Sequence, residues 1–417
     1  MWSVFVLFLV PAYGISPDLK TAAAEKILLT TLPTALGAGM RLPYALAVAR
    51  FGGRNWTVVS ACVLLVPAIS AAVALRPGTS LGTLLLLAAL AGAGGGNFAS
   101  SMANINAFYP QRLKGRALGL NAGGGNVGVA VVQLTGLAVL ATAGQGHPRV
   151  VLGIYIPLIV LAALAAALLM DNLADVRNKK RAMRDACREP HTWIISFLYI
   201  GTFGSFIGFG FAFGQVLQNQ FGAHFRTAGT VGPVKIACLT ALGPLVGSLI
   251  RPAGGWLADR AGGARTTFWI FAAMAAAAAA VLAASRERSL ELFCGGFVTL
   301  FALSGAGNGS TYKMIPAIFA DRPRPGAGAG ADPDAAGRES RRMASAVIGI
   351  AGAAGAAGGV LVNIAFRQSF LSYGTGDAAY IAFIALYLCC LAVTWTVYLR
   401  APGGRPAPLP GSSVPAG

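Results

Sequence analysis

An arginine stands inside an apolar run that is long enough to cross a bilayer. Arg41 lies between Ile27 and Ala49, a stretch that holds no other charged residue. A membrane-spanning helix needs about 20 apolar residues, and an arginine near its centre costs about 2.5–3.5 kcal/mol on insertion scales. A chain that keeps such a residue has a partner or a task for it. Arg41 therefore predicts a functional site at the middle of a membrane.

The arginine stretch occurs twice in the chain. Its second copy is IRPAGGWLADRAGGAR, residues 250–265, and aligning Arg251 with Arg41 also aligns the residues that follow. The aligned pairs are Arg50 with Arg260, Gly52 with Gly262, and Gly53 with Gly263. Other matching stretches are LAGAGGGN (90–97) with LSGAGNGS (303–310), and Gly119, Gly125 and Gly128 with Gly349, Gly355 and Gly358. The chain therefore contains two copies of one unit, each with a buried arginine.

The overall composition is that of a polytopic membrane protein. Hydrophobic residues make up 56% of the chain and charged residues 11%, whereas soluble domains carry about 25% charged residues. Windows of about 20 residues give twelve predicted spans at 2–15, 27–49, 56–75, 81–108, 116–142, 149–170, 192–221, 235–258, 266–285, 292–319, 343–366 and 378–398. The first span is short, and we interpret it as the end of a helix whose start is missing. A cleaved signal peptide is the alternative, which the absence of preceding basic residues disfavours.

The basic residues sort by side of the predicted membrane. Of the 32 lysines and arginines, 20 lie in the tail or in loops that follow even-numbered spans, and eight lie in the opposite loops. Because positive charge marks the cytoplasmic side, we expect a multi-pass protein of the cytoplasmic (inner) cell membrane with both termini in the cytoplasm. The net charge of +18 then reflects membrane orientation, so we expect no nucleic-acid partner, and we expect a monomer in the lipid bilayer.

Polar segments divide the chain into two halves. Residues 171–190 predict a cytoplasmic linker between an N-terminal six-helix bundle (1–170) and a C-terminal six-helix bundle (191–400). Residues 320–342 predict a disordered cytoplasmic loop within the second bundle, and residues 401–417 predict a disordered cytoplasmic tail. Two parallel six-helix repeats indicate an all-α membrane protein with the major facilitator fold, in which the substrate site lies between the halves.

The charges inside the spans are cationic and lack acidic partners. All 14 acidic residues fall in loops or at span ends. We therefore predict that the counter-ion of the buried arginines is the transported substrate, an anion. A guanidinium is a planar fork of donors that suits a planar oxyanion. The alternative is that Arg41 and Arg251 reach toward the interface or bind backbone carbonyls. The six cysteines have no metal-binding spacing and the three histidines lie at span ends, so neither a metal nor a cofactor is expected.

Asparagines accompany the glycines of the fourth and fifth spans. We interpret most of these glycines as sites of close helix packing. That packing does not explain Asn97 and Asn126, because an amide in apolar surroundings is costly unless it is hydrogen-bonded. Both asparagines therefore predict a wet cavity, in which an amide donates to an anion without carrying charge.

Four motifs resemble those of the nitrate/nitrite porter family within the major facilitators. They are GGGNFASSMANINAFYP (94–110), KGRALGLNAGGGNVG (114–128), FLYIGTFGSFIGFGFAF (197–213) and SGAGNGSTYKMIPAIF (304–319). The resemblance implies that one arginine from each half clamps the planar anion, and these match Arg41 and Arg251. The implied lining of the site matches Phe98, Tyr199, Phe203 and Asn126. The departures from the family pattern are the short first span and Ala122, where a glycine is expected.

Other charged residues lie near these motifs. Lys313 follows the glycine run of the tenth span, and we place it with the substrate-binding residues; the alternative is a lysine that reaches the cytoplasmic surface. GGWLADRAGGAR is the loop motif of major facilitators, and its Asp259, Arg260 and Arg265 are assigned to gating. The first half has Ala49 in the place of Asp259, so only one copy of the motif is complete.

The predicted function is transport of nitrate, nitrite or both by alternating access. The spans hold no carboxylate or histidine that could relay a proton, which favours nitrate/nitrite exchange. Proton-coupled nitrate uptake stays open, with Lys313 as the plausible titrating group. A facilitator for another small anion or for a drug would have the same fold, although its cavity would not need two unpaired arginines. No enzymatic activity is expected, because the spans offer no carboxylate pair, metal cluster or activated nucleophile.

Overall fold

The protein is helical along each part of the chain that the structure describes. The structure, a computed structural model, describes residues 2–9, 13–109, 111–144, 147–172, 180–225, 231–320 and 333–400. The first half holds α1 (Trp2–Phe8), α2 (Leu19–Phe51), α3 (Gly53–Ala74), α4 (Leu81–Ala91), η2 (Gly92–Gly96), α5 (Asn97–Phe108), α6 (Gln111–Ala143) and α7 (Arg149–Leu169). After α8 (Lys180–Arg188), the second half holds α9 (Pro190–Tyr199), η3 (Ile200–Gly204), α10 (Ser205–Phe225), α11 (Val231–Ala261), α12 (Gly263–Arg286), α13 (Leu290–Ala320), α14 (Pro333–Tyr373), α15 (Asp377–Thr394) and η5 (Trp395–Leu399).

Eleven of the twelve predicted spans coincide with helices, whereas the first, 2–15, is helical only over α1 and includes residues outside the described part of the chain. Spans four, seven and twelve are each built from consecutive helical segments, which change geometry inside the span. In the described part of the chain, nine helices are long and apolar enough to cross a membrane by length and composition. The arginine helices α2 and α11 are not among them, although they have 33 and 31 residues. Each holds a central arginine and two prolines, which lower its mean hydropathy.

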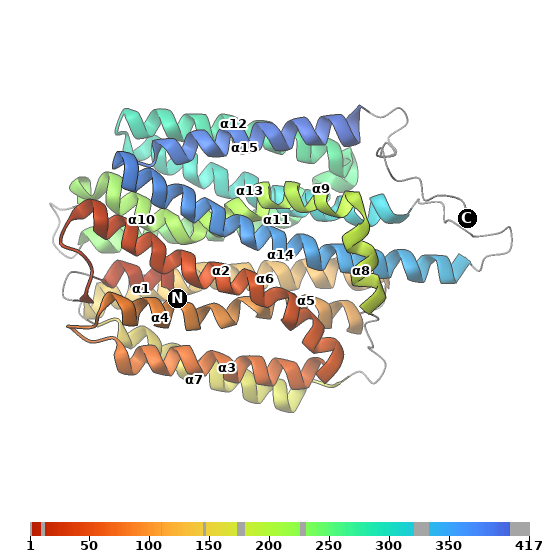
Figure 1. The fold of residues 1–417 in the computed structure, drawn as a ribbon, viewed down its shortest axis with the longest axis horizontal. Helices are drawn as coiled ribbons and strands as arrows, with labels where there is room; N and C mark the ends of the chain where they lie inside the picture. The colour runs from red at the N-terminus through yellow and green to blue at the C-terminus, as the bar shows by residue number, and fades with distance from the viewer. Residues whose placement is uncertain are drawn as a thin grey trace.

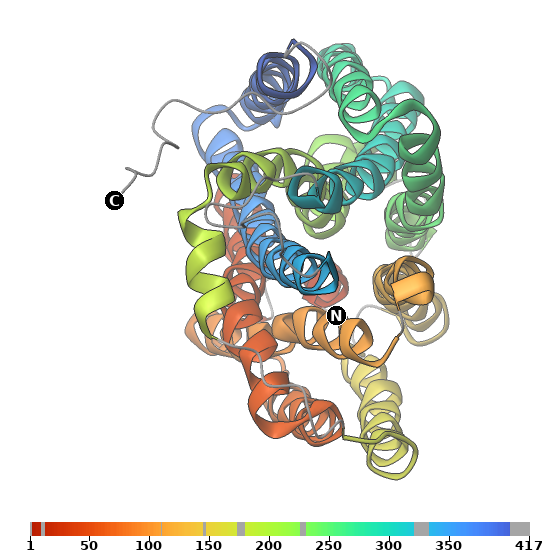
Figure 2. The same cartoon turned by 90° about the vertical axis from the view of Figure 1, so that its right-hand side faces the viewer.

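The helices form two groups that meet along a shared boundary. Most run along the long axis of the molecule (Figure 1), and the view along that axis separates the red-to-yellow helices of the first half from the green-to-blue helices of the second (Figure 2). Across the boundary α2 packs against α14, and α6 packs against α11. Both arginine helices therefore lie where the halves meet.

Two predicted polar segments contain more helix than expected. The linker 171–190 includes α8, in which Ala186 is buried and Met183 packs against the core. Residues three apart share one face of a helix, so this charged segment still has an apolar side. The predicted loop 320–342 is wrong at both ends, because α13 continues to Ala320 and α14 begins at Pro333. Residues 321–332 and the predicted tail 401–417 lie outside the described residues.

A glycine turn is repeated after each arginine helix. Gly52 connects α2 to α3 with φ of 86°, and Gly262 connects α11 to α12 with φ of 89°. These φ values, with ψ of 155° and 136°, belong to a region that glycine alone enters without strain. The same backbone conformation at aligned positions supports the repeat predicted from the sequence.

We expect Gly52→Ala to lower thermal stability more than Gly262→Ala does. A side chain at such φ costs about 1–3 kcal/mol at either position. At Gly52 the added Cβ would also meet Asn172, whose Oδ1 accepts the backbone N–H of Arg54 at 3.0 Å, whereas at Gly262 it would meet nothing within 4 Å. Melting temperatures of both variants in one detergent measure the difference. Equal losses would contradict a stabilising role for the Asn172 bridge.

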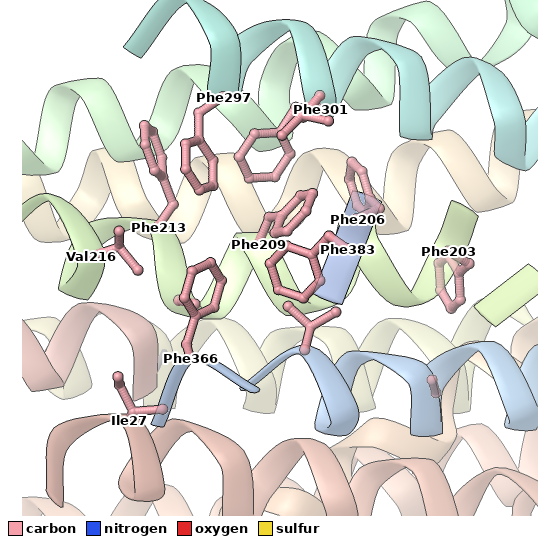
Figure 3. Close-up of a cluster of buried hydrophobic side chains, with 14 of the residues drawn as sticks. Ile27, Phe203, Phe206, Phe209, Phe213, Val216, Phe297, Phe301, Phe366 and Phe383 are labelled. Carbon is pink, nitrogen blue, oxygen red and sulfur yellow. The ribbon is translucent and has the colours of Figure 1, made fainter. Parts of the chain in front are cut away.

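Phenylalanines of the seventh span form the core of the second half. Phe209 meets Phe297 and Phe383 edge-on at 5.5 Å, and Phe213 stacks on Phe297 at 4.6 Å. These rings come from α10, α13 and α15 and lie together in Figure 3. Phe203 lies beyond the end of this cluster in the same view. The cluster fixes α10 to the second half and holds the start of the span at the boundary.

Candidate anion-binding site

Two arginines are buried at the boundary between the halves. Arg41 of α2 and Arg251 of α11 are each 7% exposed, and each is followed within two residues by a proline. The ion pairs among the described residues, Lys313–Asp259 and Arg286–Asp377, include neither arginine. Within the described parts of the chain, both buried charges therefore have no carboxylate partner.

The ring of Phe203 contacts both guanidinium groups. Its centroid is 5.0 Å from Cζ of Arg41 and 5.9 Å from Cζ of Arg251. Phe98 contacts Arg41 at 5.2 Å, and Tyr199 stacks on Phe203 with centroids 5.0 Å apart and planes 13° apart. Contacts between cations and ring faces stabilise buried arginines by about 0.5–2 kcal/mol each. The structure thus brings five of the predicted site residues together.

The hydrogen-bonding capacity of these arginines is only partly used. Nη1 of Arg41 donates to the carbonyl oxygen of Gly352 at 2.9 Å, and Nη2 of Arg251 donates to the hydroxyl of Tyr199 at 3.2 Å. Nε of Arg41 and Nη1 of Arg251 are buried and have no partner among the described residues. The same holds for Nδ2 of Asn126, which is 4% exposed. Because an unpaired buried donor costs about 1–3 kcal/mol, the site favours an acceptor such as an oxyanion.

Helical geometry changes where the chain supplies the aromatic rings. The π-helical turn η3 follows Tyr199 and contains Phe203, and the 3₁₀ turn η2 directly precedes Asn97 and Phe98. In a regular α-helix, residues four apart are offset by about 40° around the axis; the wider π turn changes that offset and lets Tyr199 and Phe203 stack. Such turns inside a longer helix are frequent at functional sites.

The glycines near the site are of two kinds. In η2 they mark close packing, since a Cβ at Gly92 would lie 2.6 Å from Cβ of Leu36. In α6 the close-packing interpretation is wrong, because a Cβ at Gly124 or Gly128 would meet nothing within 4 Å. These glycines leave open space beside Asn126 at the boundary.

Lys313 does not lie with the arginines. Its Nζ forms an ion pair with Asp259 of α11, and both side chains are half-exposed. Successive residues of a helix point about 100° apart, so α13 directs Tyr312 toward the site and Lys313 toward solvent. Asn97 is half-buried with an unpartnered Oδ1, and the structure gives it no contact with either guanidinium.

Tyr312 also belongs to the site, although it was not predicted from the sequence. Its ring lies 5.6 Å from Cζ of Arg251 and meets Tyr199 edge-on at 4.7 Å. One turn earlier, Asn308 is fully buried, and neither atom of its amide has a partner among the described residues. The four-residue spacing of Asn308 and Tyr312 within SGAGNGSTYKM places them on one helix face, and that spacing could have identified them.

The three predicted gating residues lie in one half of the protein. Asp259 pairs with Lys313, so it joins α11 to α13. The guanidinium of Arg260 lies 4.1 Å above the ring of Trp256, and Arg265 is exposed. A role of these residues in gating stays a prediction.

We expect Lys313→Gln to leave nitrate affinity unchanged and to reduce stability slightly. The pair with Asp259 is half-exposed, so its coupling should be about 0.2–1 kcal/mol. A double-mutant cycle with Asp259→Asn, read by thermal unfolding and by nitrate binding, measures both quantities. A loss of nitrate affinity in Lys313→Gln, but not in Asp259→Asn, would support the prediction that Lys313 binds the substrate.

A repeated pair of helix groups around a central buried site defines a secondary transporter. The family model of the Major Facilitator Superfamily matches residues 1–361. The chain belongs to this superfamily.

Several relatives cover most of the chain. It is 36% identical over 401 residues to the nitrate/nitrite transporter NarU of Salmonella typhimurium, covering 90% of this chain and 84% of that protein. It is 32% identical over 401 residues to the probable nitrate/nitrite antiporter NarK2 of Thermus thermophilus, covering 91% and 84%. A crystal structure of a D-xylose-proton symporter matches 94% of both chains with a TM-score of 0.65 at 12% identity, which supports the fold alone.

Proposed function

We propose that the protein moves nitrate, nitrite or both across the cytoplasmic membrane by alternating access, as an exchanger. The observation that carries this proposal is the pair of buried guanidinium groups that both contact Phe203 and keep unpaired N–H donors. The names of the relatives, which are nitrate/nitrite transporters and antiporters, support the same substrate.

A planar anion suits the shape of the site. Guanidinium forks donate in their own plane, and the rings of Phe98 and Phe203 are nearly parallel, 29° apart, with centroids separated by 6.0 Å. A flat, singly charged oxyanion can accept from both arginines and from Asn126 beside these rings. Tetrahedral sulfate or phosphate is thicker and more strongly hydrated, so the space beside the two rings is less suited to it.

Anion binding couples to movement of the halves through charge. Two positive charges repel each other more strongly in a buried site than in water, because the effective dielectric constant is lower there. A bound anion neutralises part of this repulsion and lets the halves close around it. Arg41 of the first half donates to the Gly352 carbonyl of the second. The anion competes for that guanidinium, so binding and the contact between halves are linked.

Exchange is favoured because no carboxylate or histidine of the described residues contacts the two arginines. Lys313, the group suggested for proton coupling, pairs with Asp259 away from the arginines. Arginine stays protonated at physiological pH.

The distribution of basic loops favours an inner-membrane protein with both termini in the cytoplasm.

We expect proteoliposomes loaded with nitrite to take up labelled nitrate without a pH gradient. Empty vesicles with an imposed pH gradient should show no uptake above a protein-free control, because no described carboxylate, histidine or lysine contacts the two arginines. Chlorate and nitrite should compete with nitrate, and equal sulfate should not. Gradient-driven uptake into empty vesicles would instead establish proton-coupled uptake. Absence of nitrate counterflow under both conditions would contradict the proposed substrate.

A further inference from the structure

The helix α10 has an apolar face and a polar face. Phe209 and Phe213 pack into the second half (Figure 3). Phe211, Gln215 and Gln218 lie on the opposite face by helical spacing. Phe211 lines a cavity of about 420 Å³ together with residues of the first half, and Gln218 contacts α2. The polar residues of α10 therefore face the boundary between the halves.

Two glutamines at this boundary are buried with unused amide atoms. Gln215 is fully buried, and neither Oε1 nor Nε2 has a hydrogen-bond partner among the described residues. Gln133 of α6 is 3% exposed; its Nε2 donates to the Gly210 carbonyl at 3.2 Å, whereas its Oε1 has no described partner. Buried amides without partners are costly, which indicates that they serve another state or a ligand.

A lysine stands opposite these glutamines. Nζ of Lys26, on α2, lies 3.5 Å from Oε1 of Gln218. The ion pairs of the described residues do not include Lys26. The neighbouring carboxylate of Glu25 instead accepts the backbone N–H of Ser16 at 2.8 Å. Lys26 is thus a cation at the boundary whose only described polar contact is an uncharged amide.

These residues lie toward one end of the molecule. α2 begins at the end opposite to α8 (Figure 1), and Lys26 is about two turns into α2. At 1.5 Å per residue, it lies roughly 22 Å along the helix from Arg41. On α6, Gln133 is seven residues from Asn126 and on the same face. Polar groups therefore follow the boundary from Lys26 to the arginine site.

We propose that Lys26, Gln218 and Gln215 form a second, outer binding site for the transported oxyanion. The inference rests on the proposed function, because the ligand is the same monovalent oxyanion. An ammonium with amide donors and no carboxylate attracts such an anion, and a single charge binds it weakly enough to release it toward the arginines. When the halves rock apart at this end, the site opens and raises the local anion concentration at the entrance.

The test is the Michaelis constant for nitrate at each face of the membrane. In proteoliposomes of one established orientation, Lys26→Gln should raise KM about fivefold for nitrate added at the face where α2 begins, with kcat and the KM at the other face unchanged. Gln215→Leu should raise the same KM, whereas Lys26→Arg, which keeps the positive charge, should leave the KM at its wild-type value. Arg76→Gln is the matched control, because it removes an exposed arginine at the same end, beyond the end of α3, and should change neither constant.

Three outcomes would overturn the inference. An unchanged KM in Lys26→Gln, with normal wild-type counterflow, would contradict the outer site but not the proposed function. A lower KM at that face with a higher KM at the other identifies Lys26 as a latch that holds the end closed. Absence of nitrate counterflow in the wild-type protein would remove the proposed function, and the outer site with it. Melting temperatures of each variant verify that it is folded.

Discussion

Replacing Arg41 or Arg251 with lysine is expected to lower nitrate affinity by at least about 100-fold, or roughly 2.7 kcal/mol. Each guanidinium already donates to a protein oxygen, Gly352 or Tyr199, and keeps a second buried N–H free. A compact ammonium on a flexible stem keeps the charge but cannot reproduce a planar fork with divergent donors. Hydrogen bonds to charged groups contribute about 1.5–3 kcal/mol each, so the loss of one oriented contact accounts for this effect. Calorimetric titration of nitrate into the purified variants measures it.

The chain supplies a matched control for these two substitutions. Arg50 and Arg260 follow the site arginines by nine residues in each copy of the repeat and are exposed. Arg50→Lys makes the same chemical change outside the site and outside the predicted gating residues, and it should leave nitrate affinity unaltered. Nitrate binding at full strength by both Arg41→Lys and Arg251→Lys would disprove the clamp. Loss in only one of them would show that one half holds the anion.

The sequence was sufficient to predict the spans and the two arginines. Span length follows from bilayer thickness, and a charge inside an apolar run is conspicuous whatever the packing around it. The repeat placed Gly52 and Gly262 in equivalent turns, and both have positive φ. The structure also brings Phe98, Tyr199 and Phe203, which the family resemblance implied, to the arginines.

The remaining features of the site depend on side-chain direction and on backbone atoms. Lys313 and Tyr312 are neighbours in sequence, and only the rotation of α13 decides which of them faces Arg251. The Gly352 carbonyl that accepts from Arg41 has no side-chain signature. The π-helical turn η3 was not predicted from the sequence of the seventh span. Composition also hid α8, because its charged residues outweigh the apolar side that packs on the core.

Phe203→Ala is expected to weaken nitrate binding by about 10- to 100-fold and to reduce the preference for nitrate over sulfate. The ring is 1% exposed and contacts both guanidiniums and the rings of Phe98 and Tyr199. Its loss removes two cation–π contacts of about 0.5–2 kcal/mol each and opens space in which the arginines can rotate. Titrations with nitrate, and competition of nitrate by sulfate, measure affinity and selectivity on the same sample.

Phe203→Ala could weaken nitrate binding through lost packing or through lost contacts with the anion. Phe213→Ala separates these two effects. Phe213 belongs to the same span and is fully buried, but it stacks on Phe297 within the second half. Removing either ring should cost about 3–5 kcal/mol of stability, whereas only Phe203→Ala should change nitrate affinity and admit sulfate. An equal loss of affinity in both variants would mean that the ring acts through packing alone. Full nitrate affinity in a folded Phe203→Ala protein would show that the anion does not lie against this ring.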